Sequence, residues 1–194
     1  MSNINKIKRG LIVLCIFLLG SLFIFINTKN QPKEQTYEEI VEDIKSYKTY
    51  NSYDNIFLVK APSTWNEVED KNSLNENAIL ELHNSKTNAY LVAIVTNKLD
   101  VEDSFEIFKK DVFTQKENHY GIKINEYKDV VVDGYNSQYI EFYNTNEDHI
   151  NTYIRSYAIE TKNYYVQIML WTLKSNEELV GQEFDNIIDN FKEI

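Results

Sequence analysis

An uncharged apolar segment near the start of the chain sets the first limit on what the chain can form. Residues 11–26, LIVLCIFLLGSLFIFI, contain no charged side chain, and only Gly20 and Ser21 dilute their apolar character. A helix of this length is about 24 Å long, slightly short of a ~30 Å hydrocarbon core. Because the segment is apolar on every face and lies at the end of the chain, it indicates a membrane span and not a buried core helix.

Basic residues predict the orientation of this span. Lys6, Lys8 and Arg9 precede it. The positive-inside rule therefore predicts a cytoplasmic N-terminus and an extracellular domain. We expect residues 1–30 to form a cytoplasmic tip and a single-pass anchor in the cell membrane, with the lipid bilayer as the partner of residues 11–26.

Two other fates of the segment compete with a retained anchor. A cleaved signal peptide needs small residues before the cut, and residues 24–28 (IFINT) offer no such pattern. A lipoprotein needs a small residue before its modified cysteine, whereas Cys15 follows Leu14. A retained anchor is the favoured interpretation.

The charge of the remaining chain argues against nucleic acid as a partner. The chain has 20 basic and 30 acidic residues and a net charge of −10. Four of the basic residues lie in residues 1–30, which leaves 16 basic against 30 acidic residues, a balance of −14. Nucleic-acid binding needs clustered Lys and Arg, so we expect none here.

The chemistry-bearing residues predict no catalytic or metal centre. Cys15 is the only cysteine, so the domain beyond the anchor has no thiol for a disulfide, a zinc site or a nucleophile. His83, His119 and His149 have no metal-ligand spacing, and common nucleophile and nucleotide motifs are missing. We therefore expect no enzyme activity, no metal and no cofactor.

Periodicity divides the rest of the chain into a tether and one domain. Residues 31–51 are expected to form a tether and an amphipathic helix, the helix over 36–47. The domain over 52–194 alternates strand and helix patterns, with Trp65 in a turn, Asp100 capping the middle helix and Gly121 ending it. Its expected strands are 55–61, 78–83, 89–96, 128–132, 135–143, 150–161 and 164–173, and its helices are 101–119 and 177–191. Asp133-Gly134 predicts a tight hairpin.

This order favours an α+β fold with helices covering an antiparallel sheet. Three features of the sequence support a particular family. Residues 57–65 (FLVKAPSTW) have the pattern of a strand followed by Pro and Trp, and residues 131–135 (VVDGY) have that of a hairpin. The final strand leads into a helix with Phe184, Ile187, Ile188 and Phe191. Over residues 52–194 the chain resembles the Mog/PsbP-like family, including its membrane-attached bacterial members. The resemblance implies a six- or seven-stranded antiparallel sheet flanked by helices, an α/β/α sandwich. It implies no activity, because members range from photosystem subunits to nuclear-transport factors.

Two neighbouring strands carry a tyrosine-rich face. Strand alternation places one set of polar and aromatic side chains on the same side, and Arg155 among them is the only arginine beyond the anchor. Arginine among tyrosines could hold a carboxylate or a partner group. The structural alternative is cross-strand tyrosine packing with a Glu141–Arg155 pair under a covering helix, and it is favoured. The candidate face consists of Tyr139, Glu141, Tyr143, Tyr153, Arg155 and Tyr157.

The leading hypothesis is a membrane-anchored, non-enzymatic extracytoplasmic domain that binds an envelope protein or a small ligand, or assists an envelope complex. The alternative is a ligand-binding sensor or an enzyme with its site on the candidate face. A cavity beside Arg155 and Glu141 would favour the alternative, and a helix sealing that face would oppose it.

Overall fold

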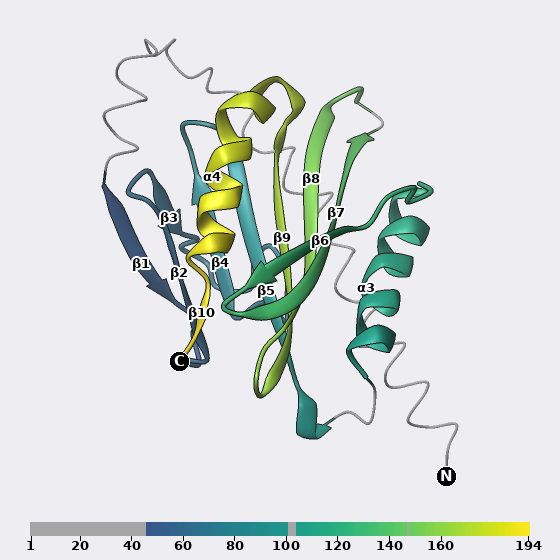
Figure 1. The fold of residues 1–194 in the computed structure, drawn as a ribbon. Helices are drawn as coiled ribbons and strands as arrows, with labels where there is room; N and C mark the ends of the chain where they lie inside the picture. The colour runs from purple at the N-terminus through teal and green to yellow at the C-terminus, as the bar shows by residue number, and fades with distance from the viewer. Residues whose placement is uncertain (1–45, 101–103, 147) are drawn as a thin grey trace.

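The computed structural model describes residues 46–100, 104–146 and 148–194 (Figure 1). The predicted anchor at residues 11–26 lies outside these ranges. Within them, no helix is long and apolar enough to cross a membrane. The elements are, in order, β1 (Tyr47–Asn51), β2 (Phe57–Pro62), β3 (Trp65–Glu67), β4 (Leu80–Asn84), β5 (Ala89–Asn97), the 3-10 turn η2 (Lys98–Asp100), α3 (Phe105–Tyr120), β6 (Lys128–Val132), β7 (Tyr135–Thr145), β8 (Asn151–Glu160), β9 (Tyr164–Leu173), the 3-10 turn η3 (Lys174–Asn176), α4 (Glu177–Asp189) and β10 (Lys192–Glu193).

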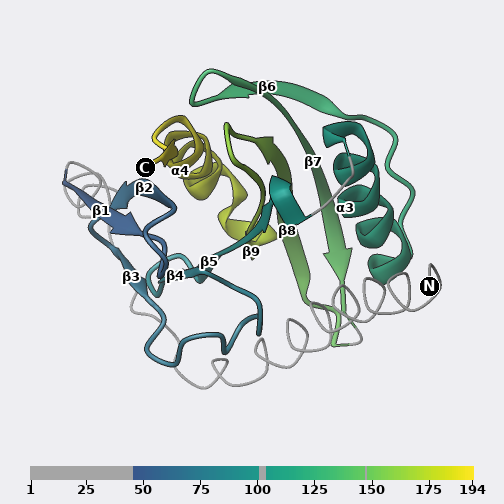
Figure 2. The same ribbon diagram turned by 90° about the horizontal axis from the view of Figure 1, so that it is seen from below.

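The centre of the fold is a seven-stranded antiparallel sheet in the order β3-β4-β5-β9-β8-β7-β6. A second sheet of three strands has the order β1-β2-β10. The helix α4 and the small sheet lie against one face of the large sheet, and α3 lies against the other (Figures 1 and 2). This is the α+β architecture that the order of the elements and the family resemblance predicted.

Each face of the large sheet buries its own core. On the α4 side, Phe57 of β2, Ile168 of β9 and Phe184 of α4 are all fully buried in one cluster. On the α3 side, Val112 and Phe113 pack against β7 and β8. Alternate residues of a strand point to opposite faces, so β7, β8 and β9 each supply both cores.

The predicted elements are confirmed with shifted ends, except in three places. The first strand begins earlier in the chain than expected. Residues 47–51 form β1, which pairs with β2. The sequence had predicted that they belong to the tether and its helix. The hydroxyl of Tyr50 donates to the carbonyl of Trp65, and this long-range contact outweighs the local helical spacing. The predicted helix residues 36–45 lie outside the described ranges.

The other two differences concern Trp65 and Asp100. Trp65 begins the short strand β3 and does not lie in a turn, because its indole donates to Glu183 of α4 at 2.9 Å and joins the sheet edge to the helix. Asp100 ends the turn η2, and the residue at the N-cap of α3 is Ser104. Gly121 ends α3 as predicted, with φ at +62°.

Candidate functional site

The structure brings the six residues of the candidate face into one cluster. In the β7–β8 pair, Tyr139 lies opposite Tyr157, Glu141 opposite Arg155, and Tyr143 opposite Tyr153. The first tyrosine pair stacks with ring centres 4.8 Å apart, and the other pair is tilted at 5.6 Å. The predicted alternation is therefore correct. Tyr153 and Tyr157 are buried, whereas Tyr143 is 48% exposed.

Arg155 joins this cluster to α4. Its side chain is only 12% exposed and forms an ion pair with Asp185 of α4. A second nitrogen of the guanidinium donates to the Tyr153 hydroxyl, which in turn donates to Glu141 at 2.7 Å. Glu141 also pairs directly with Arg155 at 3.4 Å. The guanidinium is thus held between two strands and a helix.

Glu141 is the anionic centre of the network. Burial by itself would raise its pKa, but hydrogen bonds from Lys128 and Tyr153 and the charge of Arg155 together hold the pKa below its usual value. The carboxylate is therefore ionised at neutral pH and already occupied by protein donors.

The contacts agree with the structural interpretation of the candidate face. Cross-strand tyrosines pack, Glu141 pairs with Arg155, and α4 covers the guanidinium. Burial raises the pKa of Tyr153 and of Tyr157, which keeps both hydroxyls neutral. Ligand binding by these six residues stays a prediction, and Arg155 acts in this structure as a brace for α4.

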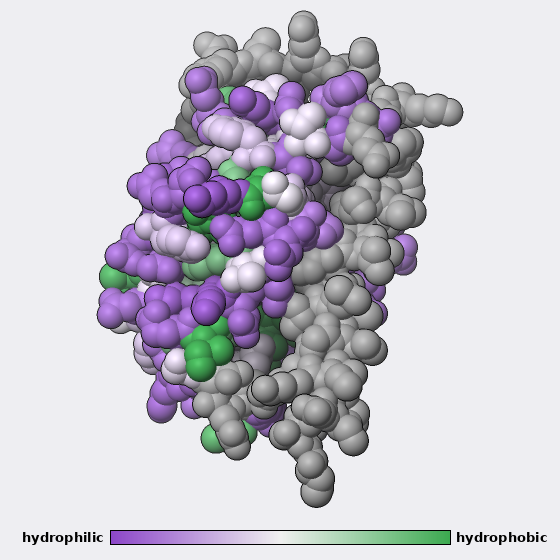
Figure 3. Space-filling view, turned by 90° about the vertical axis from the view of Figure 1, so that its right-hand side faces the viewer, coloured by the Kyte–Doolittle hydropathy of each residue, from purple (hydrophilic) through white to green (hydrophobic). Residues whose placement is uncertain are grey.

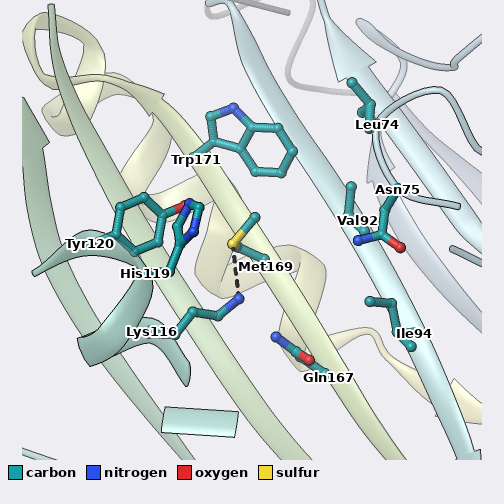
Figure 4. Close-up of a pocket in the computed structure, with 10 residues that line it drawn as sticks. All are labelled: Leu74, Asn75, Val92, Ile94, Lys116, His119, Tyr120, Gln167, Met169 and Trp171. Carbon is teal, nitrogen blue, oxygen red and sulfur yellow. Dashed lines mark hydrogen bonds between the residues drawn. The ribbon is translucent and has the colours of Figure 1, made fainter. Parts of the chain in front are cut away.

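A different feature, a recess on the opposite face of the sheet, was not predicted. It lies between α3, strands β9 and β5, and the loop before β4 (Figure 4). The cavity has a volume of about 30 Å³. Apolar and aromatic side chains predominate among its lining residues, which are Leu74, Asn75, Val92, Ile94, Lys116, His119, Tyr120, Gln167, Met169 and Trp171.

Lys116 projects from α3 toward β9 within this recess (Figure 4). Its residue is 0% exposed, and its amine donates to the sulfur of Met169 at 3.5 Å. Burial lowers the pKa of Lys116 to about 7, because the charged form loses its hydration. A buried lysine with a lowered pKa is a candidate functional group.

Histidine and aromatic rings complete the recess. His119 lies on α3 and remains exposed, but the neighbouring side chains partly desolvate its ring. This desolvation and the charge of Lys116 lower the pKa of His119. Trp171 lies in the wall, stacked on Tyr90 at 5.2 Å. Tyr120 packs on Phe142 at 5.1 Å, and burial raises its pKa to about 12.

The sequence held one signal for this recess. Phe105, Phe108, Val112 and Phe113 form the apolar stripe of α3, and Lys116 continues the same spacing. A lysine on a stripe that faces the core indicates a buried charge, but only the packed structure shows what surrounds it.

The surface around α3 and the acidic residues point less clearly to a functional site than the recess does. On the side shown in Figure 3, hydrophilic side chains predominate and hydrophobic ones form small separate patches. Among the described residues, no group of His, Cys, Asp and Glu could hold a metal ion. On this face, the recess beside Lys116 has the largely apolar lining that is typical of a ligand site.

The seven-stranded antiparallel sheet between α3 and α4 defines an α+β sandwich with a recess on one face. No known family model matches the chain, and no curated protein does. Solved structures do. Cyanobacterial PsbP from Synechocystis is 12% identical, with a TM-score of 0.55 over 86% of this chain and 99% of that one.

Two further structures have the same fold. LpqN of Mycobacterium tuberculosis, described as involved in cell envelope biogenesis, is 8% identical with a TM-score of 0.52, over 84% of this chain and 98% of that one. The Ran-binding protein Mog1p of Saccharomyces cerevisiae is 12% identical with a TM-score of 0.50, over 76% and 95%. The chain therefore has a Mog/PsbP-like fold, as the resemblance indicated.

Proposed function

We propose that this chain is a membrane-anchored, extracytoplasmic binding or accessory domain of the cell envelope, and that it acts by binding and not by catalysis. The recess beside Lys116 supports the binding role, and the apolar segment at residues 11–26 supports the anchored location. Ligand sites are typically concave and apolar, with a few polar groups that fix orientation, and the recess has this composition. The binding and envelope roles in the names of Mog1p and LpqN support the same class of function.

The anchored location is tested in cells with the full chain carrying a C-terminal tag. We expect the tag in the membrane fraction and open to protease added to intact cells. A variant lacking residues 1–30 should leave the membrane fraction. Replacing Lys6, Lys8 and Arg9 with Glu should shield the tag, because these charges set the orientation. A tag that is protected in the unaltered chain would overturn the extracytoplasmic assignment.

The binding role is tested by cross-linking in the same cells. A photoreactive amino acid at His119, at the recess, should capture a partner or ligand that the same group at Val131 does not. Val131 is a matched control because it is 63% exposed on the edge strand β6. Equal capture at both positions, or none at either, would contradict binding through the recess.

A further inference from the structure

The strand β7 is longer than the strand that borders it. β6 begins at Lys128, which pairs with Tyr139, and from there β7 continues to Thr145 beside β8 alone (Figure 1). Within the described ranges no strand lies beyond this part of β7, because β6 is the last strand of the large sheet. Residues 141–145 therefore form an open edge, which is about 16 Å long.

The backbone groups of this open edge point away from the sheet. The two-residue turn between β6 and β7 makes Val132 and Tyr135 a hydrogen-bonded pair, so the odd-numbered residues of β7 direct N–H and C=O toward the β6 side. On the other side, the amide of Asn146 donates to the carbonyl of Ile150, which continues the bonding of even-numbered residues toward β8. The groups in position to pair with a further strand are the N–H and C=O of Glu141, Tyr143 and Thr145.

The open edge lacks the features that usually prevent pairing with another chain. Natural edges are interrupted by a bulge, a proline or an unpaired charge. The register of β7 with β8 runs without a bulge from Ser137 to Thr145, and residues 141–145 contain no proline. Glu141 is the charged residue in this stretch, and Lys128 and Arg155 pair with it on the α4 side. The edge is therefore suited to accept a strand.

Aromatic side chains border the open edge on both faces of the sheet. Tyr143 is exposed on the α4 side, and Phe142 is partly buried on the α3 side. Directly opposite side chains of adjacent strands lie about 5 Å apart, where aromatic and β-branched residues pair favourably. An added strand that is rich in β-branched residues would gain such contacts on both faces.

Charge decides between two kinds of occupant. The residues beyond the predicted anchor include 16 basic and 30 acidic residues, a balance of −14. A second copy of the chain would bring two domains of the same sign together, and their repulsion opposes a dimer through this edge. A basic segment of another polypeptide is attracted by the same charge.

We propose that the open edge of β7 binds an extended, basic segment of another polypeptide, which adds a strand to the large sheet. Backbone hydrogen bonds supply the affinity, and the alternate side chains that meet Phe142 and Tyr143 supply the sequence preference. Residues 141–145 are not among those that line the recess, so this inference stands independently of binding at the recess.

The test uses the full chain in a nonionic detergent. The probe is a fluorescent, capped seven-residue peptide with a lysine at each end and alternating valine and threonine between them. We expect saturable binding, measured by fluorescence anisotropy, that weakens as salt is added. The same peptide with terminal glutamates should bind more weakly. A peptide that is N-methylated at every amide has no backbone donors and should not bind.

Hydrogen exchange followed by nuclear magnetic resonance locates the added strand. With the lysine-ended peptide bound, exchange should slow at the amides of Glu141, Tyr143 and Thr145. The amides of Asp129 and Val131, on the outer side of β6, serve as the control and should exchange as before.

A pair of variants isolates one backbone donor. The N–H of residue 143 points away from β8, so Y143P removes it and leaves the hydrogen bonds between β7 and β8 in place. Y143A removes the same side chain and keeps the N–H. We expect Y143P to bind the peptide about tenfold more weakly than Y143A, because one hydrogen bond is lost and the edge is blocked. The N-methylated peptide tests the same bonding without a substitution.

Four outcomes would overturn strand addition at β7. They are no saturable binding of the lysine-ended peptide, equal binding of its N-methylated form, equal affinity in Y143P and Y143A, and slowed exchange at β6 instead of β7. Slow exchange at the open edge before any peptide is added would show another occupant. That occupant is a second copy if the chain sediments as a dimer, and residues of the same chain outside the described ranges if it sediments as a monomer.

Discussion

Lys116 lies on the stripe of α3 where the spacing of its neighbours would place an apolar residue. Its amine is fully buried. Because the charged form loses its hydration there, the pKa of Lys116 is about 7 instead of 10.5. Between these pH values the unfolded chain holds a proton on this lysine that the folded chain does not. The residue therefore destabilises the fold at neutral pH, most fully below about pH 7.

Replacing this lysine should stabilise the chain. K116M keeps the length of the side chain and removes the buried charge, so we expect a gain on the order of 4 kcal/mol at pH 7. The free energy of unfolding of the unaltered chain should rise from pH 7 toward 10.5, and this rise should vanish in K116M. Urea unfolding at several pH values measures both. A loss of stability in K116M would show that the amine contributes contacts that outweigh its desolvation.

Arg155 is the opposite case, a largely buried cation that is paired with acidic and hydroxyl groups. Glu141, Tyr153 and Asp185 surround its guanidinium. R155M should lower the free energy of unfolding by about 2–4 kcal/mol, because Glu141 loses a partner and α4 loses its brace. D185N should cost under about 1 kcal/mol, because Asp185 is 56% exposed.

Thermal unfolding of these two variants measures the difference between them. Unchanged stability combined with lost binding of a cellular partner would instead make the six-residue face a functional site.

At the scale of elements, turns and helix ends follow local sterics. Asp133 and Gly134 join β6 to β7 with φ of +49° and +83°, and both values belong to the left-handed region. Glycine adopts this region without strain, and Asp tolerates it better than most residues that carry a β-carbon. The hairpin was therefore predictable from two residues.

A pair of glycine substitutions separates conformational strain from helix propensity. G134A should lower the free energy of unfolding by about 1 kcal/mol or more, because alanine resists a φ of +83°. G181A, within α4, should raise it by up to about 1 kcal/mol. The added carbon there meets only an Arg155 nitrogen at 3.7 Å, which is ordinary contact. Chemical denaturation of both variants measures the two signs, and a stabilising G134A would refute the turn.

At the scale of the whole molecule, the net charge affects stability through many charges acting together and not through one contact. Acidic residues exceed basic ones by 10, and unscreened repulsion among them opposes the compact state. The ion pairs that the structure shows, such as Lys98–Glu160, offset this only locally.

Salt should therefore stabilise the chain. Raising NaCl from about 10 mM to about 150 mM shortens the Debye length to about 8 Å and should add about 0.5–1 kcal/mol to the free energy of unfolding. The triple variant E76Q/E126Q/E178Q, changed at three exposed positions, should respond less. Calorimetric unfolding at both salt concentrations measures this. Destabilisation by salt would show that local ion pairs outweigh general repulsion.

The two candidate sites differ in how much of each could be predicted from the sequence. The alternation of β7 and β8 placed six side chains on one face correctly, because the period of a strand is local. Their closure by α4 and the recess around Lys116 depend on chain segments that are distant in sequence. Trp65 and Glu183, for example, are 118 residues apart and still hydrogen-bonded.

The sequence by itself determined the identity of nearly every strand and helix in residues 52–194, the Asp133-Gly134 hairpin, the acidic balance and the apolar segment at residues 11–26. Each of these follows from side-chain periodicity, backbone sterics or charge within a short stretch. Only the tertiary structure decided that residues 47–51 join a second sheet, that β5 pairs with β9, that α4 braces against Arg155, and that Lys116 is buried beside Met169. These depend on which distant surfaces pack together, and no local pattern specifies that choice.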